Sequence, residues 1–376
     1  MVYAVGLMSG TSLDGIDAAL VEISGKNEQT TVKLVSFLTL AFPEGTLKRI
    51  REALSIEKST VENICSLNVE LGERFAEAVI EVCKKGSVSL EELLFIGSHG
   101  QTLFHIPKGR EDVFASTLQI GDPAVISERT KTTVISNFRE RDMAVGGQGA
   151  PIVPYSEYIL FRSDQTTRLL QNIGGIGNVT VIPKGGKLKE IIAFDTGPGN
   201  VILNELCLHF YQQEYDKDGE HAKQGTVNNE LLKELMNHPY IRRPYPKTTG
   251  REEFGKEFTF SLLERWHLSA EDWLATATMF TACSIAHAVT PFIDEKTELI
   301  VGGGGSYNRT LLEMLQNELP EVLVKTQEDL GQSSEAKEAI AMTILANQTL
   351  HHQPGNVPSA TGAERAVPLG RITYYQ

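Results

Sequence analysis

Two short apolar segments, far apart in this sequence, each run into a turn rich in glycine, threonine and aspartate. Val2–Val5 precedes Gly6–Gly15, and Ile191–Phe194 precedes Asp195–Asn200. Glycines let a backbone approach a ligand closely and adopt positive φ, and successive N–H groups in such turns form concavities that bind anions. The pair of turns therefore predicts a polyphosphate site in which the two turns close on the ligand from opposite sides.

Size and composition narrow the class of protein. A chain of 376 residues and 41.4 kDa can form two domains, and 41% hydrophobic with 22% charged residues is typical of a soluble globular protein. No apolar run is long enough to predict a membrane-spanning helix. The net charge of −13 opposes binding to nucleic acid or to an anionic membrane, although local N–H groups can still bind a small anion.

The four cysteines and the N-terminal segment indicate the cellular compartment of the protein. No two cysteines form a CxxC pair, which favours reduced thiols over disulfides or a zinc site. The N-terminal segment lacks the order of basic, apolar and small residues found in a secretory signal. We therefore expect a cytoplasmic protein.

Strand, helix and glycine-turn patterns recur in both halves of the chain, which predicts a two-domain α/β protein. We expect strands at Val2–Val5, Ile16–Ile23, Val32–Leu40, Phe95–Gly97, Arg168–Ile173, Asn178–Ile182, Ile191–Phe194 and Glu298–Val301. We expect helices over Thr60–Lys84, Ala270–Ile293 (broken near Pro291) and Glu335–Leu350, and others starting near Asp122, Asn200 and Asn308. Gly146–Pro151 is a plausible crossing between domains.

Each glycine-rich turn also has a structural interpretation. Gly6–Gly15 could be a tight turn alone, but its pairing with the turn at Asp195 favours a ligand site. Gly302–Gly305 lies between a strand and a helix, where a nucleotide base or ribose is a more natural explanation than a loose connection. A P-loop is excluded because Gly250–Lys256 is followed by a glutamate instead of serine or threonine, and no dinucleotide GxGxxG opens the first turn.

Three side chains are candidates for chemistry. Asp195 closes an apolar strand, where burial would raise its pKa and suit a general base, although it could instead cap a turn or helix. His99 lies in a polar turn after a strand, beside potential hydrogen-bonding groups for a hydroxyl-rich ligand, and a satisfied structural histidine is the alternative. Glu338 is a weaker candidate, because alone it would be an ordinary helix residue.

Eight separate motifs resemble the anhydro-N-acetylmuramic acid kinase family, cell-wall recycling sugar kinases of the actin/hexokinase-like ATPase superfamily. They occur in the same order as in the family and span essentially the whole chain, so that a match by chance is improbable. The motifs are Met8–Asp17, Gly97–Thr102, Gly146–Pro151, Asn172–Asn178, Phe194–Asn200, Gly302–Asn308, Ala336–Ala339 and Pro358–Ala363.

The resemblance implies an α/β fold of two actin/hexokinase-like (ribonuclease H-like) lobes with the active-site cleft between them. The first lobe would span residues 1–137 and the second 138–364, with the tail at about 365–376 returning to the first. The implied reaction opens 1,6-anhydro-N-acetylmuramic acid hydrolytically and phosphorylates O6, giving N-acetylmuramic acid 6-phosphate. The implied cofactors are ATP and Mg²⁺, and a homodimer is expected.

Two other functions remain open. An ordinary sugar kinase of the same superfamily would transfer phosphate to a free hydroxyl. A nucleotide-switched binding protein, chaperone- or actin-like, would hydrolyse ATP slowly without stimulation by a sugar, and it would need a partner-binding segment that this chain does not obviously have.

The resemblance also assigns roles to individual residues. Asp195 becomes the catalytic base, and Glu338 lies close to the reacting groups. The sugar-binding residues are His99, Gly100, Gln101, Thr102, Arg139 and Gln148. The nucleotide-binding residues are Gly10, Thr11, Ser12, Leu13, Asp14, Gly15, Ile16, Asp17, Gly175, Asn178, Gly197, Gly199, Asn200, Gly303 and Gly304.

The sequence leaves the metal ligands unassigned. It departs from the family pattern at Asn137, where an aspartate is usual before Phe138 and Arg139. Asparagine keeps hydrogen bonding but loses the charge, which puts a metal-ligand or charge-partner role of this position in doubt.

Overall fold

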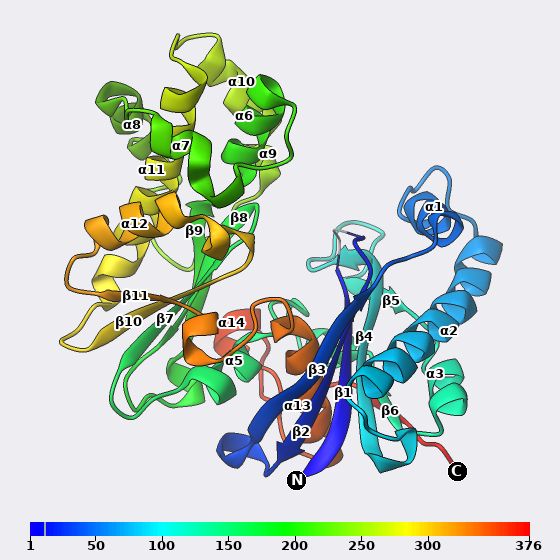
Figure 1. Ribbon diagram of the computed structural model, residues 1–376. Helices are drawn as coiled ribbons and strands as arrows, with labels where there is room; N and C mark the ends of the chain where they lie inside the picture. The colour runs from blue at the N-terminus through cyan, green and yellow to red at the C-terminus, as the bar shows by residue number, and fades with distance from the viewer. Residues whose placement is uncertain (11–12) are drawn as a thin grey trace. The chain divides into compact units, whose positions relative to one another are not determined.

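The computed structural model describes residues 1–10 and 13–376. The chain forms two compact units, each shown in Figure 1: unit 1 contains residues 1–160 and 335–376, and unit 2 contains residues 161–334. The sequence places the division after residue 137 and the return of the chain at about 365. The structure differs at both points, because residues 138–160 and the helix that follows residue 335 pack in unit 1.

Unit 1 is built on a seven-stranded sheet in the order β12-β6-β4-β1-β2-β3, with β5 beside β4. Strands β1, β2 and β3 form an antiparallel meander, β4 and β6 continue it in parallel to β1, and β12 pairs antiparallel to β6. The bounds are β1 Val2–Ser9, β2 Ile16–Ser24, β3 Thr31–Leu40, β4 Leu93–Ile106, β5 Ser116–Ile120, β6 Val134–Ser136 and β12 Arg371–Thr373.

Alternation along β1 sends its residues to two different helices. Val5 and Leu7 are fully buried in one core cluster with Phe75 of α2 (Val61–Lys85). Because successive strand residues point to opposite faces, Gly6 lies on the other face, where α13 (Lys337–Leu350) packs. The sheet of unit 1 is therefore covered on both faces (Figure 1).

Two glycines let α13 rest directly on the sheet. Gly6 and Gly97 are neighbours in the β1–β4 register. A Cβ at Gly6 would collide with the carbonyl oxygen of Ala339, and one at Gly97 with that of Met342. These glycines thus make room for the helix backbone. At Gly6 the structural interpretation of the glycine-rich segment holds.

The remaining helices of unit 1 are short. They are α1 Glu44–Ala53, α3 Pro123–Thr130, α4 Phe138–Met143, α5 Pro154–Phe161, whose last residue belongs to unit 2, and α14 Pro358–Thr361. The predicted start of α3 is confirmed, since Asp122 caps the helix and Pro123 occupies its first turn.

Unit 2 has a five-stranded sheet in the order β11-β10-β7-β8-β9. Its bounds are β7 Thr167–Ile173, β8 Ile176–Ile182, β9 Ile192–Pro198, β10 Thr297–Gly302 and β11 Leu323–Thr326. Its helices are α6 Val201–Tyr211, α7 Glu220–Gln224, α8 Asn229–Met236, α9 Arg251–Phe254, α10 Lys256–Leu263, α11 Ala270–Val289 and α12 Arg309–Glu318. Leu169 and Val179 of the sheet share a buried cluster with Ile285 of α11 and Leu311 of α12.

Short 3-10 turns complete the list of elements. They are η1 Asn27–Gln29, η2 Leu90–Glu92, η3 Leu188–Glu190, η4 Lys217–Gly219, η5 Thr290–Phe292, η6 Gly304–Tyr307 and η7 Glu328–Leu330. The break near Pro291 is confirmed, because α11 ends at Val289 and η5 follows. No helix in residues 1–10 and 13–376 is long and apolar enough to cross a membrane.

Both sheets repeat one topology: an antiparallel meander of three strands followed by two parallel strands. The prediction of a two-lobed α/β protein is thereby confirmed. Two predicted turns are wrong, however. Ser98–Thr102 belongs to β4, where Ser98 pairs with β1 and β6 and the last two residues pair with β5. Asp195–Pro198 belongs to β9, where β8 pairs with it. Strand pairing supplies the hydrogen bonds that a turn would otherwise have made locally.

Gly146–Pro151 is not the crossing between the units. The chain passes from unit 1 to unit 2 at residues 160–161, at the end of α5. Gly147 and Gly149 are instead held within unit 1 by contacts to Asp142.

Candidate active site

An acidic pocket of about 310 Å³ opens in unit 1 beside the first glycine-rich turn. Its walls come from the β1–β2 connection, β3 and the start of α13. The lining residues are Gly10, Asp14, Gly15, Asp17, Thr39, Glu335 and Glu338. The pocket thus brings four predicted nucleotide residues, Gly10, Asp14, Gly15 and Asp17, together with the predicted catalytic Glu338. Two others, Leu13 and Ile16, do not line it, because they pack with the hydrophobic core of unit 1. Thr11 and Ser12 lie outside the described residues.

Burial and nearby negative charges disfavour the charged forms of Asp17 and Glu338. Burial raises the pKa of Asp17, against a 2.6 Å hydrogen bond from Thr39 that lowers it, and the charges of Asp14 and Glu335 raise it further. Glu338 is open to solvent in the pocket, yet the protein around it raises the pKa of its carboxyl by desolvation. A bound cation would relieve this repulsion.

The donor set of this pocket fits magnesium. Carboxylate oxygens are hard ligands, and Mg²⁺ usually keeps several of its waters. Among the described residues, no three acidic, histidine or cysteine side chains are grouped closely enough to hold a metal ion. Asp14, Asp17 and Glu338 therefore suit a hydrated ion better than a fully coordinated one.

Gln101 fixes the turn that leads into the pocket. Its side chain is fully buried. Ser9 donates a 2.6 Å hydrogen bond to Gln101 Oε1, and Gln101 Nε2 donates to the carbonyl of Gly10 at 3.4 Å. Thr102 Oγ1 accepts a hydrogen bond from Gln119 at 3.2 Å. The amide of Gln101, predicted to contact a sugar, is thus occupied within the protein by the Ser9 hydroxyl and by the carbonyls of Gly10 and Thr102.

His99 orients Arg139. His99 Nδ1 donates to the carbonyl of Gly100 at 2.9 Å, and Arg139 Nε donates to His99 Nε2 at 2.8 Å. This pair of contacts requires the neutral ring with its proton on Nδ1. Burial and the positive charge of Arg139 lower the pKa of His99 to about 3. His99 therefore serves as a fixed acceptor and not as an acid or base near neutral pH.

The Arg139 guanidinium is held at two of its nitrogens. Besides its bond to His99, Nη1 donates to the carbonyl of Gly149 at 2.7 Å. Burial lowers the pKa of Arg139, and the nearby charge of Glu338 opposes that effect. The two hydrogen bonds fix the orientation of the guanidinium. Because the group remains a cation at neutral pH, its charge is available to a polar ligand.

Asp142 organises the loop that carries Gly149, and sequence reasoning missed it. Its fully buried carboxylate accepts hydrogen bonds from Gly149 N (2.9 Å), Asn356 Nδ2 (2.8 Å) and Thr361 Oγ1 (2.8 Å). Gln148 beside it is exposed, and its N–H donates to the carbonyl of Thr361 at 2.9 Å. The motifs around Gly149 and Thr361 are both visible in the sequence, but nothing there shows that one aspartate joins them.

Asn137 has a local role that the usual aspartate could not fill in the same way. It precedes α4 with φ of +60°, a left-handed conformation that asparagine tolerates. Its Nδ2 donates a 2.6 Å hydrogen bond to Glu140. An aspartate has no such donor when ionised.

Asp195 lies on β9 of unit 2, directly opposite Asn178 of β8. Its Oδ2 accepts a 3.0 Å hydrogen bond from the backbone N–H of Thr249. Burial raises the pKa of the carboxyl, and that hydrogen bond lowers it. Asp195 does not cap α6, because the residue that precedes this helix is Asn200. Its one cap-like contact is the hydrogen bond from Thr249, in the segment before α9.

The backbone amides that follow Asp195 are already used inside the protein. Gly199 and Val201 donate to the carbonyl of Gly175 at 2.9 and 3.0 Å, and Asn200 donates to that of Gly174 at 2.8 Å. A Cβ at Gly197 would lie 3.1 Å from Ser284 Oγ. Close packing and internal hydrogen bonds thus account for the glycines at 197 and 199.

A second pocket, of about 390 Å³, lies in unit 2 where β10 ends. Gly303 has φ of +78°, and a Cβ there would lie 2.7 Å from Asn172 Oδ1, whereas the nearest described atom to a Cβ at Gly304 is Asn200 Nδ2 at 3.8 Å. Aromatic, apolar and polar groups together suit a nucleoside. The lining residues are Asn200, Leu203, Asn204, Tyr215, Asp216, Lys217, Asp218, Gly304, Tyr307 and Asn308.

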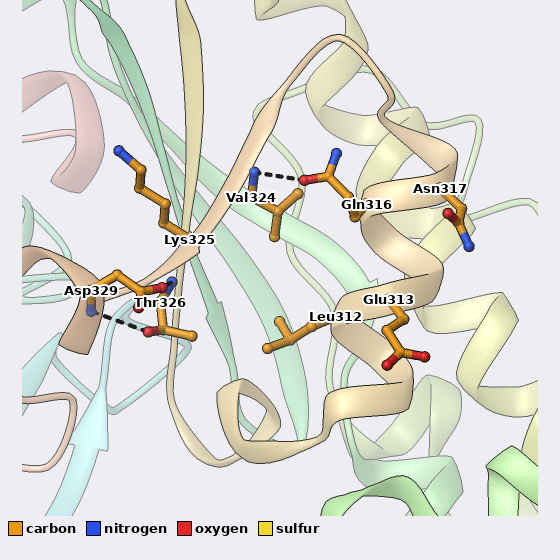
Figure 2. Close-up of a pocket in the computed structure, with 8 residues that line it drawn as sticks. All are labelled: Leu312, Glu313, Gln316, Asn317, Val324, Lys325, Thr326 and Asp329. Carbon is orange, nitrogen blue, oxygen red and sulfur yellow. Dashed lines mark hydrogen bonds between the residues drawn. The ribbon is translucent and has the colours of Figure 1, made fainter.

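Another pocket in unit 2, of about 480 Å³, lies between α12 and β11 and contains none of the predicted site residues. Figure 2 shows Gln316 of α12 accepting a 3.2 Å hydrogen bond from the N–H of Val324, with Lys325 and Glu313 pointing away from each other. Its side chains form no convergent set of polar groups, so we do not include it in the candidate site.

Comparison with known proteins identifies the class. A family model described as anhydro-N-acetylmuramic acid kinase matches residues 2–375. Proteins of that name from Bacillus cereus (strain Q1) and Bacillus thuringiensis (strain Al Hakam) are 57% and 56% identical to this chain. The first alignment covers 99% of both chains, and the second covers 100% of this chain and 99% of the relative.

The chain is thus a kinase of the phosphotransferase class. It belongs to the anhydro-N-acetylmuramic acid kinase family, which confirms the family resemblance and the enzyme class predicted from the sequence.

Similar solved structures are much more distant. The activator of the 2-hydroxyisocaproyl-CoA dehydratase from Clostridium difficile, with bound ADPNP, is 13% identical with a TM-score of 0.44 and covers 92% of this chain and 94% of its own. A ROK hexokinase from Thermus thermophilus is 15% identical with a TM-score of 0.38 and covers 90% and 98%. Similarities at this level carry no conclusion about the site.

Proposed function

We propose that this protein uses ATP to open 1,6-anhydro-N-acetylmuramic acid hydrolytically and to phosphorylate O6, giving N-acetylmuramic acid 6-phosphate. The names of relatives that are 56–57% identical over the full length support this substrate. The observation that carries the chemistry is Asp195, a carboxylate whose pKa is raised by burial and which the family motif assigns as the base. A base with a raised pKa takes a proton more readily.

In the proposed reaction, Asp195 accepts a proton from a water molecule as that water attacks the anomeric carbon. The anomeric bond to O6 breaks, and O6 then attacks the γ-phosphoryl group of ATP, which leaves ADP. The product carries one water and one phosphoryl group more than the starting sugar. Phosphoryl transfer of this kind depends mainly on positioning and electrostatic stabilisation.

Unit 1 contributes the sugar-binding residues in this proposal. Arg139 presents a cation whose direction is set by His99 and by the carbonyl of Gly149. Gln101 holds the turn at Gly10, which the family motif assigns to the ATP phosphates. A half-buried, preoriented guanidinium binds an anionic or polar group without first having to be ordered.

ATP and magnesium are assigned to the two pockets. The pocket beside Gly304 suits the nucleoside. The acidic pocket would hold a hydrated Mg²⁺ through one or two of the carboxylates of Asp14, Asp17 and Glu338, and the ion would supply positive charge to the phosphates. Removal of the ion with a chelator should abolish ADP formation, and added Mg²⁺ should restore it.

We also propose a cytoplasmic homodimer. The four cysteines are unpaired, which agrees with a reducing compartment. Two-fold dimers are the commonest assemblies among soluble oligomers. Light scattering coupled to size-exclusion chromatography tests this point, and a mass of one chain at micromolar concentration would contradict it.

The deciding experiment measures ADP release from Mg-ATP with and without 1,6-anhydro-N-acetylmuramic acid, followed by product mass. We expect sugar-dependent ADP release and a product that has gained both water and phosphate. Phosphate gained on a free sugar, with no reaction of the anhydro compound, would select the ordinary sugar kinase. ADP release that no sugar changes would instead favour the nucleotide-switched binding protein.

A further inference from the structure

One segment of unit 2, residues 240–249, contacts Asp195 at three separate points. Tyr240 Oη donates a 2.7 Å hydrogen bond to the Asp195 carbonyl, and Asp195 N donates to the carbonyl of Lys247 at 3.0 Å. Thr249 N donates to the Asp195 carboxylate at 3.0 Å. Two of these contacts fix the backbone of Asp195, and the third directs its side chain.

Lys247 closes this segment on itself. It is buried, whereas Arg242–Pro246 and Thr248 are exposed. Its Nζ donates to the carbonyls of Tyr240 (3.2 Å) and Ile241 (3.1 Å) and lies 4.6 Å from the centroid of the Tyr240 ring. The lysine therefore joins the two ends of the segment, next to the residues that touch Asp195.

The setting of Lys247 is unusual for a lysine. None of the ion pairs among residues 1–10 and 13–376 includes it. A buried ammonium without a carboxylate is unfavourable unless its hydrogen bonds compensate, and here burial and the charge of Arg243 lower its pKa. A residue held in this way needs a reason, and the three contacts to Asp195 supply one.

The other charged groups around the segment also converge on Thr249. Arg243 lies 5.2 Å from the centroid of the Tyr240 ring and pairs with Glu253 at 2.9 Å. Glu253 accepts a 2.8 Å hydrogen bond from Thr249 Oγ1. Among the described residues, the titratable and charged groups of this network are thus Tyr240, Arg243, Lys247 and Glu253, together with His238, whose Nδ1 accepts a 3.3 Å hydrogen bond from the N–H of Tyr240.

We propose that Tyr240 and Lys247 are positioning residues that hold the Asp195 carboxylate against the N–H of Thr249, in the orientation needed to take a proton. This inference rests on the proposed role of Asp195 as the base. Neither side chain is proposed to touch substrate. Both act through the backbone of residues 195 and 249.

A specific change in pH dependence follows. A hydrogen bond to the charged form lowers a carboxyl pKa, and burial raises it. Loosening the segment weakens the Thr249 contact while Asp195 stays buried, so the pKa of Asp195 rises. Because the base must be deprotonated, the acid limb of kcat/KM for the sugar then moves to higher pH.

The test compares Tyr240→Phe, Lys247→Met and Lys247→Arg with the wild type. Arg242→Gln is the control, since Arg242 is exposed and donates only to Asn237 among the described residues. We expect Tyr240→Phe to lower kcat about five- to tenfold and to raise the acid limb by roughly half a pH unit, with KM for ATP unchanged. Lys247→Met should move the limb by about one unit, and Lys247→Arg by less.

Tyr240→Phe decides the matter, because it changes no charge and little volume. An acid limb unchanged in this variant overturns the inference, whatever happens to kcat or to Lys247→Met. Titration of the ¹³C-labelled carboxyl of Asp195, assigned with Asp195→Asn, reports the same shift without turnover. A wild type inactive on the anhydro sugar would refute the proposed function, while this titration would still decide the role of the segment.

Discussion

Units 1 and 2 share a strand order, β3-β2-β1-β4-β6 and β9-β8-β7-β10-β11, but they differ in the connection after the first strand. In unit 1 that connection, with Gly10 and Gly15, opens on a pocket of carboxylates. In unit 2 it is the pair Gly174–Gly175, whose carbonyls accept the first N–H groups of α6 and its preceding residues. A repeated topology thus fixes where a turn lies, while its length and hydrogen bonds decide whether it can meet a ligand.

The largest effect is expected from Asp195→Asn in unit 2. The amide keeps the size of the side chain but cannot accept the proton, so kcat should fall by roughly 10²–10⁴-fold. ATP affinity, measured by calorimetry, should change less than about twofold, since no charge near the nucleotide pocket is removed. Asp164→Asn, an exposed position in the same unit, is the matched control. Near-normal turnover of Asp195→Asn would remove this residue from the reaction.

The same position predicts the pH dependence of the wild type. Because burial raises the pKa of Asp195, protonation begins at a higher pH than for an ordinary aspartate, and kcat/KM should fall as pH drops through that raised value. A pH–rate profile measures the limb. A profile that stays flat down to the ordinary aspartate range would contradict the assignment.

Substitution of a closely packed glycine in unit 1 by alanine should lower the free energy of unfolding much more than the same substitution at an unpacked glycine in unit 2. Gly6→Ala forces α13 away from the sheet and should lower the free energy of unfolding by about 1–3 kcal/mol. Gly175→Ala meets no heavy atom within 4 Å among the described residues and should change it by less than about 0.5 kcal/mol. Urea denaturation followed by circular dichroism measures both. Equal effects would mean that the two connections do not differ in packing.

His99 should make the stability of unit 1 depend on pH. Its folded pKa of about 3 lies below the ordinary value of 6.5, so the unfolded chain binds more protons between these values. Stability is therefore full above pH 6.5 and declines as the pH falls, by roughly 1–2 kcal/mol between pH 6.5 and 5. His99→Gln, which cannot titrate, should flatten this part of the melting-temperature profile, and an unchanged slope would show that His99 does not cause it.

The smallest effect concerns the glycine run of unit 2. Gly304 lines the pocket proposed for the nucleoside and has room for a methyl group. Gly304→Ala should leave the free energy of unfolding within about 0.5 kcal/mol and weaken ATP binding by up to about tenfold. Gly303→Ala, at a left-handed φ, should instead destabilise the fold by about 1 kcal/mol or more. Unchanged ATP affinity in Gly304→Ala would separate this pocket from the nucleotide.

Sequence patterns predicted local structure well and tertiary placement less well. The apolar periodicity of α2 shows a helix and its buried face, whereas α13 is buried along almost its whole length and shows no single face. Neither pattern shows which sheet the helix will cover. For this reason the sequence places the whole of α13 in the second lobe, whereas it lies in unit 1. The polar segment Ser98–Thr102 resembles a turn in sequence because it pairs with β1, a strand about 90 residues earlier in the chain, as the register of Ser98 with Leu7 shows.

The candidate site shows the same limit. Asp195, Glu338 and Arg139 could be named from motifs, since their neighbours in sequence are distinctive. Asp142 and Lys247 could not, because their roles depend on hydrogen bonds to residues brought near them only by folding. Gly6 could not be told from a ligand-binding glycine, because a helix backbone and a phosphate make the same demand for space.

The packing of α13 against Gly6 and Gly97 has a consequence for synthesis on the ribosome. Residues 1–160 emerge first, but the helix that covers Gly6 and Gly97 emerges only after the whole of unit 2. At typical elongation rates, of order ten residues per second, this gap lasts many seconds. Nascent chains arrested beyond residue 334 should show protease resistance in unit 2 before unit 1, and the opposite order would refute this sequence of events. Unit 1, whose synthesis begins first, thus completes its fold after unit 2.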